Sequence, residues 1–370
     1  MKVKKIAALL LAGLMTFSMG SFAAAEDVTV ETIYGSVEIS GTPERVCVLD
    51  ISALDVMDTL GLGEYVTTVM HKKNMPTYLE EYYNSDSIIV LQRERNNKGN
   101  DGNKSEESEG ETSTERETEK QTEETETTDP YELYYSIDAD LIIATAETVD
   151  EELYSILSQI APTVVLGYAM DHEEGMYAGV KANARTIASI WGVEDKLDEL
   201  TVEYDTIYQE LDEKLEGVSA VLMNSAMDIG RLQVVTPIEE DEEASKTETE
   251  KDGLMLQELG MNMISNEAPE EIVTASTYEK NAEADVLAEK GQVIAAWVEE
   301  VNPDYVVLVD RSFDSIKEAN AEGYSCAELE GLTVYQEGRI CQLPIDGNNG
   351  VGGLHATFLQ LDELKAFFLE

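Results

Sequence analysis

Short apolar runs rich in valine and isoleucine recur along this chain, and helix-length segments separate them. Such runs stand at 45–50, 66–70, 87–91, 140–145 and 163–167 and, after a long gap, at 219–227, 232–237 and 305–310. Continuous apolar strands are typical of parallel sheets that are buried on both faces. The pattern therefore predicts an α/β fold with central, mostly parallel sheets.

The gap between the two groups of strands is predicted to be helical. One apolar stripe at helical spacing runs from Val180 to Trp191, and a second runs from Leu197 to Leu215. A length of 370 residues also suggests two lobes rather than one. We expect an N-terminal lobe at 26–172, connecting helices at 173–216 and a C-terminal lobe at 217–370. Within the last lobe, a strand hairpin is predicted at 332–344 and an amphipathic helix at 354–369.

Two segments lack the apolar residues that a core needs. Residues 93–128 contain no Ala, Val, Ile, Leu, Met, Phe, Trp or Tyr, and 239–252 repeat this acidic composition on a smaller scale. Nothing in them offsets the entropy of ordering a backbone, so we predict disordered surface insertions. These insertions either act as an adaptor or a cell-wall-compatible surface extension, or they are simply solvated loops.

Charge and the N-terminus bear on partners and compartment. The chain carries 76 acidic and 25 basic side chains, a net charge of −51, which disfavours nucleic acid and anionic membranes as partners. Three lysines among the first five residues precede an apolar run at 6–15, and Ala23–Ala25 follows. This arrangement predicts a secretory signal peptide at 1–25 and export of the mature protein.

The cysteines, the histidines and the absence of catalytic motifs disfavour a metalloprotein and an enzyme. Cys326 precedes the predicted hairpin and Cys341 lies within it; they either pair or stay free, whereas Cys47 is expected to be a buried thiol. The three histidines lack the close spacing of metal ligands, so we expect no metal site and no intrinsic cofactor. The chain also has no nucleophile elbow or phosphate-binding loop, which disfavours an enzyme.

The two predicted lobes contain an internal echo. Residues 136–147 and 300–311 both pass through a short acidic turn into an apolar strand with a polar end. Open α/β sheets bind ligands at the carboxyl ends of their strands, which predicts a site in the cleft between the lobes. Arg311 ends one of these strands, where it either contacts a ligand or pairs with Asp310 or Asp314.

Five stretches together resemble the substrate-binding proteins of ABC importers for ferric siderophores, haem and cobalamin, most of all the branch for catecholate siderophores. They are "TPERVCVLDISALDVMDTLGLGEYV", "MPTYLEEY", "IDADLIIATAETVDEELYSILSQIAPTVV", "NPDYVVLVDRS" and "GVGGLHA". The resemblance covers nearly all of 28–370 except the acidic insertions. It implies two α/β lobes joined by a long rigid helix, a shallow cleft between them, and docking of the lobe tips onto a membrane permease.

The resemblance assigns Arg311 a role but departs from the family elsewhere. It implies that Arg311 faces the anionic iron chelate, because a guanidinium offers a charged, planar fork of donors. The matching position of the first lobe reads Ala146-Glu147 instead of an arginine. Lys290 stands where relatives have an iron-coordinating histidine, and Asn348 and Asn349 occupy the loop expected to carry a tyrosine. The iron-ligating residues of the family are therefore not visible in this sequence.

Further candidates follow from the first lobe. Asp50, Ile51 and Ser52 form a strand-to-helix turn that is expected to face the cleft, and Tyr78 is either a pocket wall or a packed surface aromatic. Asp55 aligns with an acid that docks on permease arginines, although an acid on an exposed first helical turn is also favourable for the helix dipole. Glu258 is the weaker docking candidate of the second lobe.

The predicted function is therefore the extracytoplasmic capture of a ferric siderophore, by a protein expected to be a monomer, for delivery to an ABC permease. Haem or cobalamin is the alternative ligand within the same family, and His71, His172 and His355 lie near methionines that suit haem. A surface scaffold or adhesin is a further alternative. No cysteine follows the apolar run of the signal, so we expect no lipid anchor.

Overall fold

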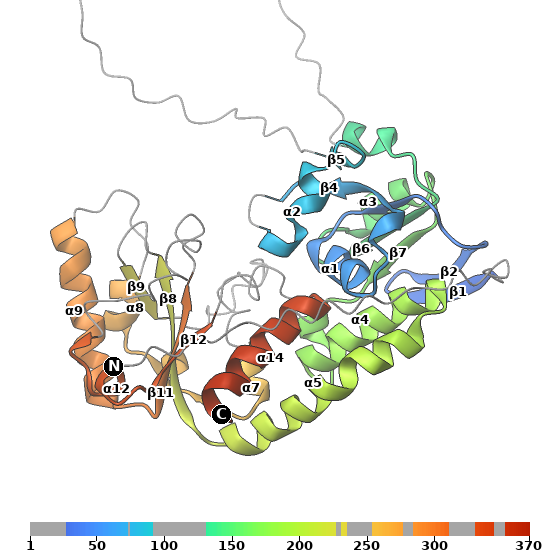
Figure 1. The fold of residues 1–370 in the computed structure, drawn as a ribbon. Helices are drawn as coiled ribbons and strands as arrows, with labels where there is room; N and C mark the ends of the chain where they lie inside the picture. Colours follow the sequence, from blue (N-terminus) through green and yellow to red (C-terminus); the bar gives the residue numbers. More distant parts are fainter. Residues whose placement is uncertain are drawn as a thin grey trace, which may run out of the picture.

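The computed structural model describes residues 27–72, 75–91, 131–226, 231–234, 254–276, 284–310, 330–343 and 352–370. The segments 93–128 and 239–252, the predicted signal peptide and Cys326 lie outside these residues. The described parts form two α/β lobes, one at each end of a pair of long helices (Figure 1).

The first lobe is built on a five-stranded sheet in the order β5-β4-β3-β6-β7. All of its neighbouring strands pair in parallel. The strands are β3 (Val46–Val48), β4 (Val66–Met70), β5 (Ile89–Leu91), β6 (Leu141–Thr145) and β7 (Thr163–Leu166). Its helices are α1 (Ile51–Thr59), α2 (Glu80–Asn84) and α3 (Glu151–Leu157), with the short 3-10 turns η1 (Gly63–Tyr65), η2 (Thr77–Leu79), η3 (Glu132–Ser136) and η4 (Ala169–Asp171). A hairpin that the sequence analysis did not predict, β1 (Val28–Thr32) and β2 (Gly35–Ile39), precedes the sheet.

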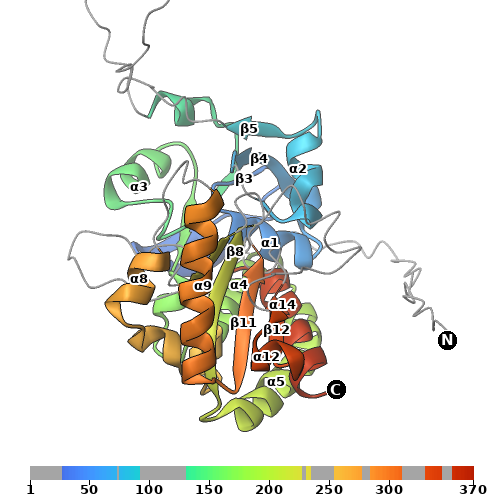
Figure 2. The ribbon, with the colours of Figure 1, turned by 90° about the vertical axis from the view of Figure 1, so that its left-hand side faces the viewer.

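The second lobe contains a sheet in the order β10-β8-β11-β12, parallel throughout, with β9 antiparallel to β8. The strands are β8 (Ser219–Ala226), β9 (Arg231–Val234), β10 (Asn262–Met263), β11 (Tyr305–Asp310) and β12 (Ile340–Leu343). The other elements are α7 (Leu254–Glu258), η6 (Ile264–Glu267), α8 (Glu270–Ser276), α9 (Ala284–Val301) and α12 (Thr333–Gln336). Figure 2 shows α9 lying across one face of this sheet.

The predicted hairpin at 332–344 is wrong. The first half forms the short helix α12, and the second half, β12, pairs in parallel with β11. The physical reason is a tertiary cap: the carboxylate of Glu299 on α9 accepts hydrogen bonds from the backbone N–H of Thr333 at 2.9 Å and from its hydroxyl at 2.7 Å. Cys341 is a free, buried thiol on β12, and Cys47 is a free, buried thiol on β3.

The lobes are joined by α4 (Met176–Trp191) and α5 (Glu194–Leu215), and the last helix, α14 (Leu354–Phe368), packs against both of them and against α1. Alternate strand residues point to opposite faces of each sheet. Thus Leu141 and Ile143 of β6 share one continuous core with Val307 and Val309 of β11 and with the three long helices. The intervening strand residues enter two separate outer cores, one under α3 and one under α8 and α9. A core shared by both lobes makes their connection a packed unit.

The similar segments 136–147 and 300–311 make equivalent hydrogen bonds in the two lobes. Asp140, just before β6, accepts a hydrogen bond from the backbone N–H of Arg45, just before β3, at 2.7 Å. Asp304, just before β11, accepts one from the backbone N–H of Ser219, at the start of β8, at 2.9 Å. In each lobe, an acid at the start of one central strand therefore ties the start of its neighbour.

Candidate ligand-binding site

The strand order places a crevice at the ends of β3 and β6. From β3 the chain proceeds to β4 on one side, whereas from β6 it proceeds to β7 on the other side. Such a switch point leaves a crevice at the carboxyl ends of the two strands, where open α/β sheets bind ligands. The loops that follow β3 and β6 contain Asp50–Ser52 and Glu147. The structure therefore brings these sequence-predicted residues to one place.

The turn after β3 is held by its own side chains. Asp50 is the N-cap of α1, and its Oδ1 accepts hydrogen bonds from the Ser52 backbone N–H at 2.9 Å and from the Ser52 hydroxyl at 2.5 Å. A carboxylate at this position satisfies an otherwise unpaired N–H of the first helical turn. Ile51 is buried in the shared core instead of facing a ligand. Ser52 is the most exposed of the three.

A small pocket lies at this point and draws its walls from distant parts of the chain. It is lined by Ser52, Thr145, Glu147, Gly167, Tyr168, Ala169, Met170, Asn183 and Gly352. Its volume of about 10 Å³ is room for about one water. Thr145 is 4% exposed, and its Oγ1 has no hydrogen-bond partner among the described residues. A bound group that fills the pocket can satisfy this hydroxyl.

Asp55 lies one turn further along α1 and is fully buried. Its carboxylate accepts hydrogen bonds from the Tyr78 hydroxyl at 2.5 Å, from the His355 backbone N–H at 2.7 Å and from the Ala356 backbone N–H at 3.0 Å. The Tyr78 ring also meets the His355 ring edge-on, with 4.4 Å between centroids. Burial raises the pKa of Asp55 to about 6, although the three hydrogen bonds act in the opposite direction.

The exposure that we expected of Asp55 is therefore wrong. Apolar neighbours surround it in the sequence "ALDVM", and α1 is buried on most of its surface, so the carboxylate points into the protein. Glu258 is half-buried and also makes hydrogen bonds within the protein. Its carboxylate accepts hydrogen bonds from the backbone N–H groups of Met176 and Tyr177 at the start of α4. The permease docking predicted for both acids stays a prediction.

The remaining predicted residues divide into described and undescribed ones. Glu147 is exposed and lines the pocket, whereas Tyr78 is half-buried against Asp55 and His355 and does not line it. Lys290 lies in the first half of α9 and is half-buried. Arg311, Asn348 and Asn349 lie outside the described residues; the strand β11 itself ends at Asp310.

Sequence reasoning missed two features of this site. Lys72 follows β4 next to His71, which was considered only as a haem ligand, and both lie exposed at the same edge of the sheet as Asp50. The letters "HK" after an apolar strand could have marked them as cations at a strand end. The role of the glycines in "GVGGLHA" was also missed: Gly352 has a φ of +90°, and a Cβ on Gly353 would lie 2.4 Å from Cγ of Asp55.

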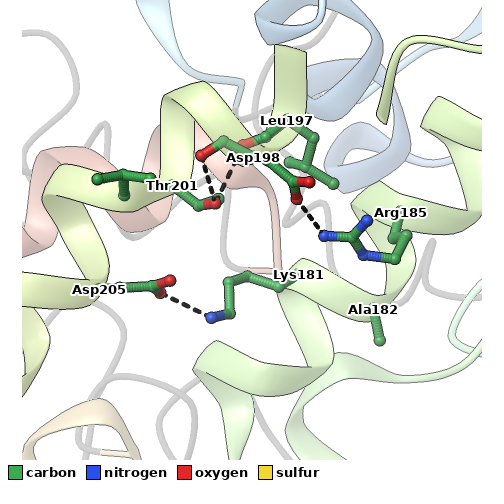
Figure 3. Close-up of a pocket in the computed structure, with 8 residues that line it drawn as sticks. Lys181, Ala182, Arg185, Leu197, Asp198, Thr201 and Asp205 are labelled. Carbon is green, nitrogen blue, oxygen red and sulfur yellow. Dashed lines mark hydrogen bonds and ion pairs between the residues drawn. The ribbon is translucent and has the colours of Figure 1, made fainter. Parts of the chain in front are cut away.

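A larger groove lies elsewhere, between α4 and α5 (Figure 3), with a volume of about 490 Å³. Lys181 pairs with Asp205 at 2.6 Å across it, and Arg185 pairs with Asp198. These cations are already neutralised by carboxylates. We therefore place the candidate ligand site at the smaller pocket rather than in this groove.

Within the described ranges, no group of three or more His, Cys, Asp or Glu side chains is arranged to hold a metal ion. No described helix has the length and apolar character needed to cross a membrane.

The two lobes, the parallel sheets and the helical connection define the class of fold: it is that of the periplasmic binding proteins with two α/β lobes. The fold class predicted from the sequence is thereby confirmed. No family model matches the chain.

Particular relatives make the likeness more specific. The petrobactin-binding protein YclQ of Bacillus subtilis (strain 168) is 24% identical over 303 residues, which cover 80% of this chain and 73% of the relative. Its crystal structure matches 94% of this chain and 100% of its own, with a TM-score of 0.57 and 19% identity.

Two further solved structures share the fold. The periplasmic catecholate-siderophore binding protein VctP of Vibrio cholerae matches 92% of this chain and 100% of its own, with a TM-score of 0.55 and 20% identity. The iron uptake ABC transporter substrate-binding protein PiuA of Streptococcus pneumoniae matches 93% and 99%, with a TM-score of 0.53 and 20% identity. The resemblance to siderophore-binding proteins of ABC importers is confirmed.

Proposed function

We propose that this chain is the extracytoplasmic substrate-binding component of an ABC importer, and that it captures a ferric siderophore for delivery to a membrane permease. The observation that carries the proposal is the convergence of Ser52, Glu147 and Gly352 on one pocket at a strand switch point. The likeness to petrobactin- and catecholate-binding proteins supports an iron chelate as the ligand.

The proposed ligand contacts come from both lobes. Asp50, Ser52, Tyr78 and Glu147 form the first-lobe side, and Lys72 adds a positive charge at the same sheet edge. On the second-lobe side we assign Arg311 the main role toward an anionic chelate, with Lys290, Asn348 and Asn349 as further contacts. Local cations are needed because a net charge of −51 otherwise repels an anionic ligand.

Direct titration tests the proposal. The mature protein is titrated with ferric petrobactin, a ferric hydroxamate, haem and cobalamin while intrinsic fluorescence and the melting temperature are followed. A ligand that binds only the folded state raises the melting temperature by mass action. We expect saturable binding of the ferric catecholate, weakened by roughly 1–3 kcal/mol in Arg311→Ala, the scale of a charged hydrogen bond. Absence of binding by all four ligands overturns the proposal.

Haem or cobalamin is the second candidate, and the position of His355 favours examining it. This side chain is half-buried beside the pocket and packs against Tyr78. A Soret band that appears on addition of haem and is lost in His355→Ala would replace the siderophore with haem.

The proposal includes export, a monomeric state and no catalytic role. Mass spectrometry of the secreted protein should find Glu26 at the N-terminus without a lipid. Deletion of 93–128 and 239–252 separates the importer from a surface scaffold, since ligand binding persists in the first case and affinity for partners is lost in the second.

A further inference from the structure

We propose that Asp55 is a positioning residue of the ligand site: its buried carboxylate fixes the segment Gly352–Ala356, whose Gly352 lines the pocket, and holds Tyr78 against that segment. This inference rests on the proposed function, because it concerns how that same site is formed. It gives Asp55 a role different from the permease docking that the sequence suggested.

The hydrogen bonds of Asp55 come from three separated donors. Tyr78 belongs to η2, 23 residues away, whereas His355 and Ala356 belong to the first turn of α14, about 300 residues away. The first N–H groups of a helix have no partner within that helix, and a negative charge next to them is stabilising. The 15-residue helix α14 thus receives its N-terminal partner from α1 of the first lobe.

Close packing leaves this segment little freedom to shift. A Cβ on Gly353 would lie 2.4 Å from Cγ of Asp55, so the backbone there runs directly against the carboxylate. At the adjacent Gly352, a Cβ would lie 3.5 Å from Cβ of Ser52. Gly352 and Ser52 both line the pocket. A displacement of the start of α14 therefore moves a pocket wall.

Tyr78 does not itself line the pocket, but the same carboxylate holds it against the start of α14. The Tyr78 hydroxyl donates to Asp55 Oδ2, and the Tyr78 ring packs edge-on against the His355 ring. Tyr78 and the start of α14 consequently move together. A single buried acid, Asp55, thus connects three of the sequence motifs. It belongs to "ISALD" and accepts hydrogen bonds from Tyr78 of "MPTY" and from the end of "GVGGLHA".

The chain provides a matched control on the same helix. Asp58 accepts a hydrogen bond from the Tyr82 hydroxyl at 2.6 Å, so it makes the same kind of carboxylate–tyrosine bond. Among the described residues, neither Asp58 nor Tyr82 lines the pocket or bonds to α14. Asp58→Asn therefore removes a similar interaction without touching the pocket walls.

The test compares Asp55→Asn, Tyr78→Phe, their double variant and Asp58→Asn at pH 7.5, with ferric petrobactin as the probe. We expect affinity to fall about tenfold in Asp55→Asn, as for loss of one charged hydrogen bond. The affinity of the double variant should be little lower than that of Asp55→Asn. Asp58→Asn should bind the chelate like the unchanged protein. At saturation, the induced circular dichroism of the iron chelate should change in both variants that carry Asp55→Asn and stay unchanged in Asp58→Asn. Unchanged affinity and an unchanged spectrum in Asp55→Asn overturn the inference.

A ligand-independent measurement separates this inference from the proposed function. The chemical shifts of the backbone amide protons of His355 and Ala356 should change markedly in Asp55→Asn. The same shifts should stay unchanged in Asp58→Asn. If no ferric chelate binds, the proposed function fails while these shifts still report the positioning. If the chelate binds and the amide signals do not move, only the positioning fails.

Discussion

The carboxylate of Asp55 and the backbone N–H of His355 lie 2.7 Å apart although 300 residues separate them in the chain. This contact ties the first lobe to the last helix at the edge of the pocket. Because the acid is fully buried, its ionisation makes the stability of the protein depend on pH in an unusual direction.

Asp55 should make the protein less stable as the pH rises from about 4 to about 6. The unfolded chain releases this proton near 3.8, whereas the folded protein keeps it until about 6, so the folded state binds more protons in this window. The shift corresponds to about 3 kcal/mol of the free energy of unfolding. Urea unfolding of the unchanged protein and of Asp55→Asn should show their difference declining across this window. A difference that rises or stays flat contradicts the prediction.

Asp304 should show the opposite pH dependence. Hydrogen bonds from the hydroxyl and the backbone N–H of Ser219 hold the pKa of Asp304 below its ordinary value. The unfolded state therefore takes up the proton first as the pH falls, and the stability that Asp304 provides is present at neutral pH and lost in acid. The gap in urea midpoint between the unchanged protein and Asp304→Asn should close as the pH falls below the ordinary aspartate pKa of 3.8. A gap that widens in acid would show that Asp304 does not act in this way.

Glu258→Ala should destabilise the protein by about 1 kcal/mol, the usual cost of removing a helix cap. The N-cap residue of α4 is Gly175, which has no side chain, and Glu258 accepts hydrogen bonds from the next two backbone N–H groups instead. Thermal or urea unfolding measures the loss. Glu210→Ala, an exposed acid on α5, is the control and should lie within about 0.5 kcal/mol of the unchanged protein.

Gly353→Ala should destabilise the protein by about 1–3 kcal/mol, the range for forcing extra volume into a packed site. The new methyl group would collide with the carboxylate of Asp55. Gly331→Ala is the matched control, because a Cβ there meets no atom within 4 Å. Equal stability of the two variants would show that the segment before α14 yields more easily than its contacts imply.

Local pattern was sufficient for most secondary structure. The strand runs, the two apolar helical stripes and the final helix were predicted because buried strands and amphipathic helices carry their own periodicity. The segment 332–344 was mispredicted, because the cap that makes its first half helical comes from Glu299 on another helix. Asp55 was taken as exposed for a similar reason: an acid in a helix gives no local sign of which distant donors will surround it.

The sequence by itself determined the α/β class, the order of the strands along the chain and the turn residues Asp50–Ser52, since these depend on neighbours in the chain. Only the tertiary structure decided which distant segments meet: that Asp55 receives Tyr78 and the start of α14, that Glu258 caps α4, and that Gly352 closes a pocket against Ser52. The physical reason is that hydrogen bonds and close packing between remote segments depend on the final arrangement in space, which no short stretch of sequence encodes.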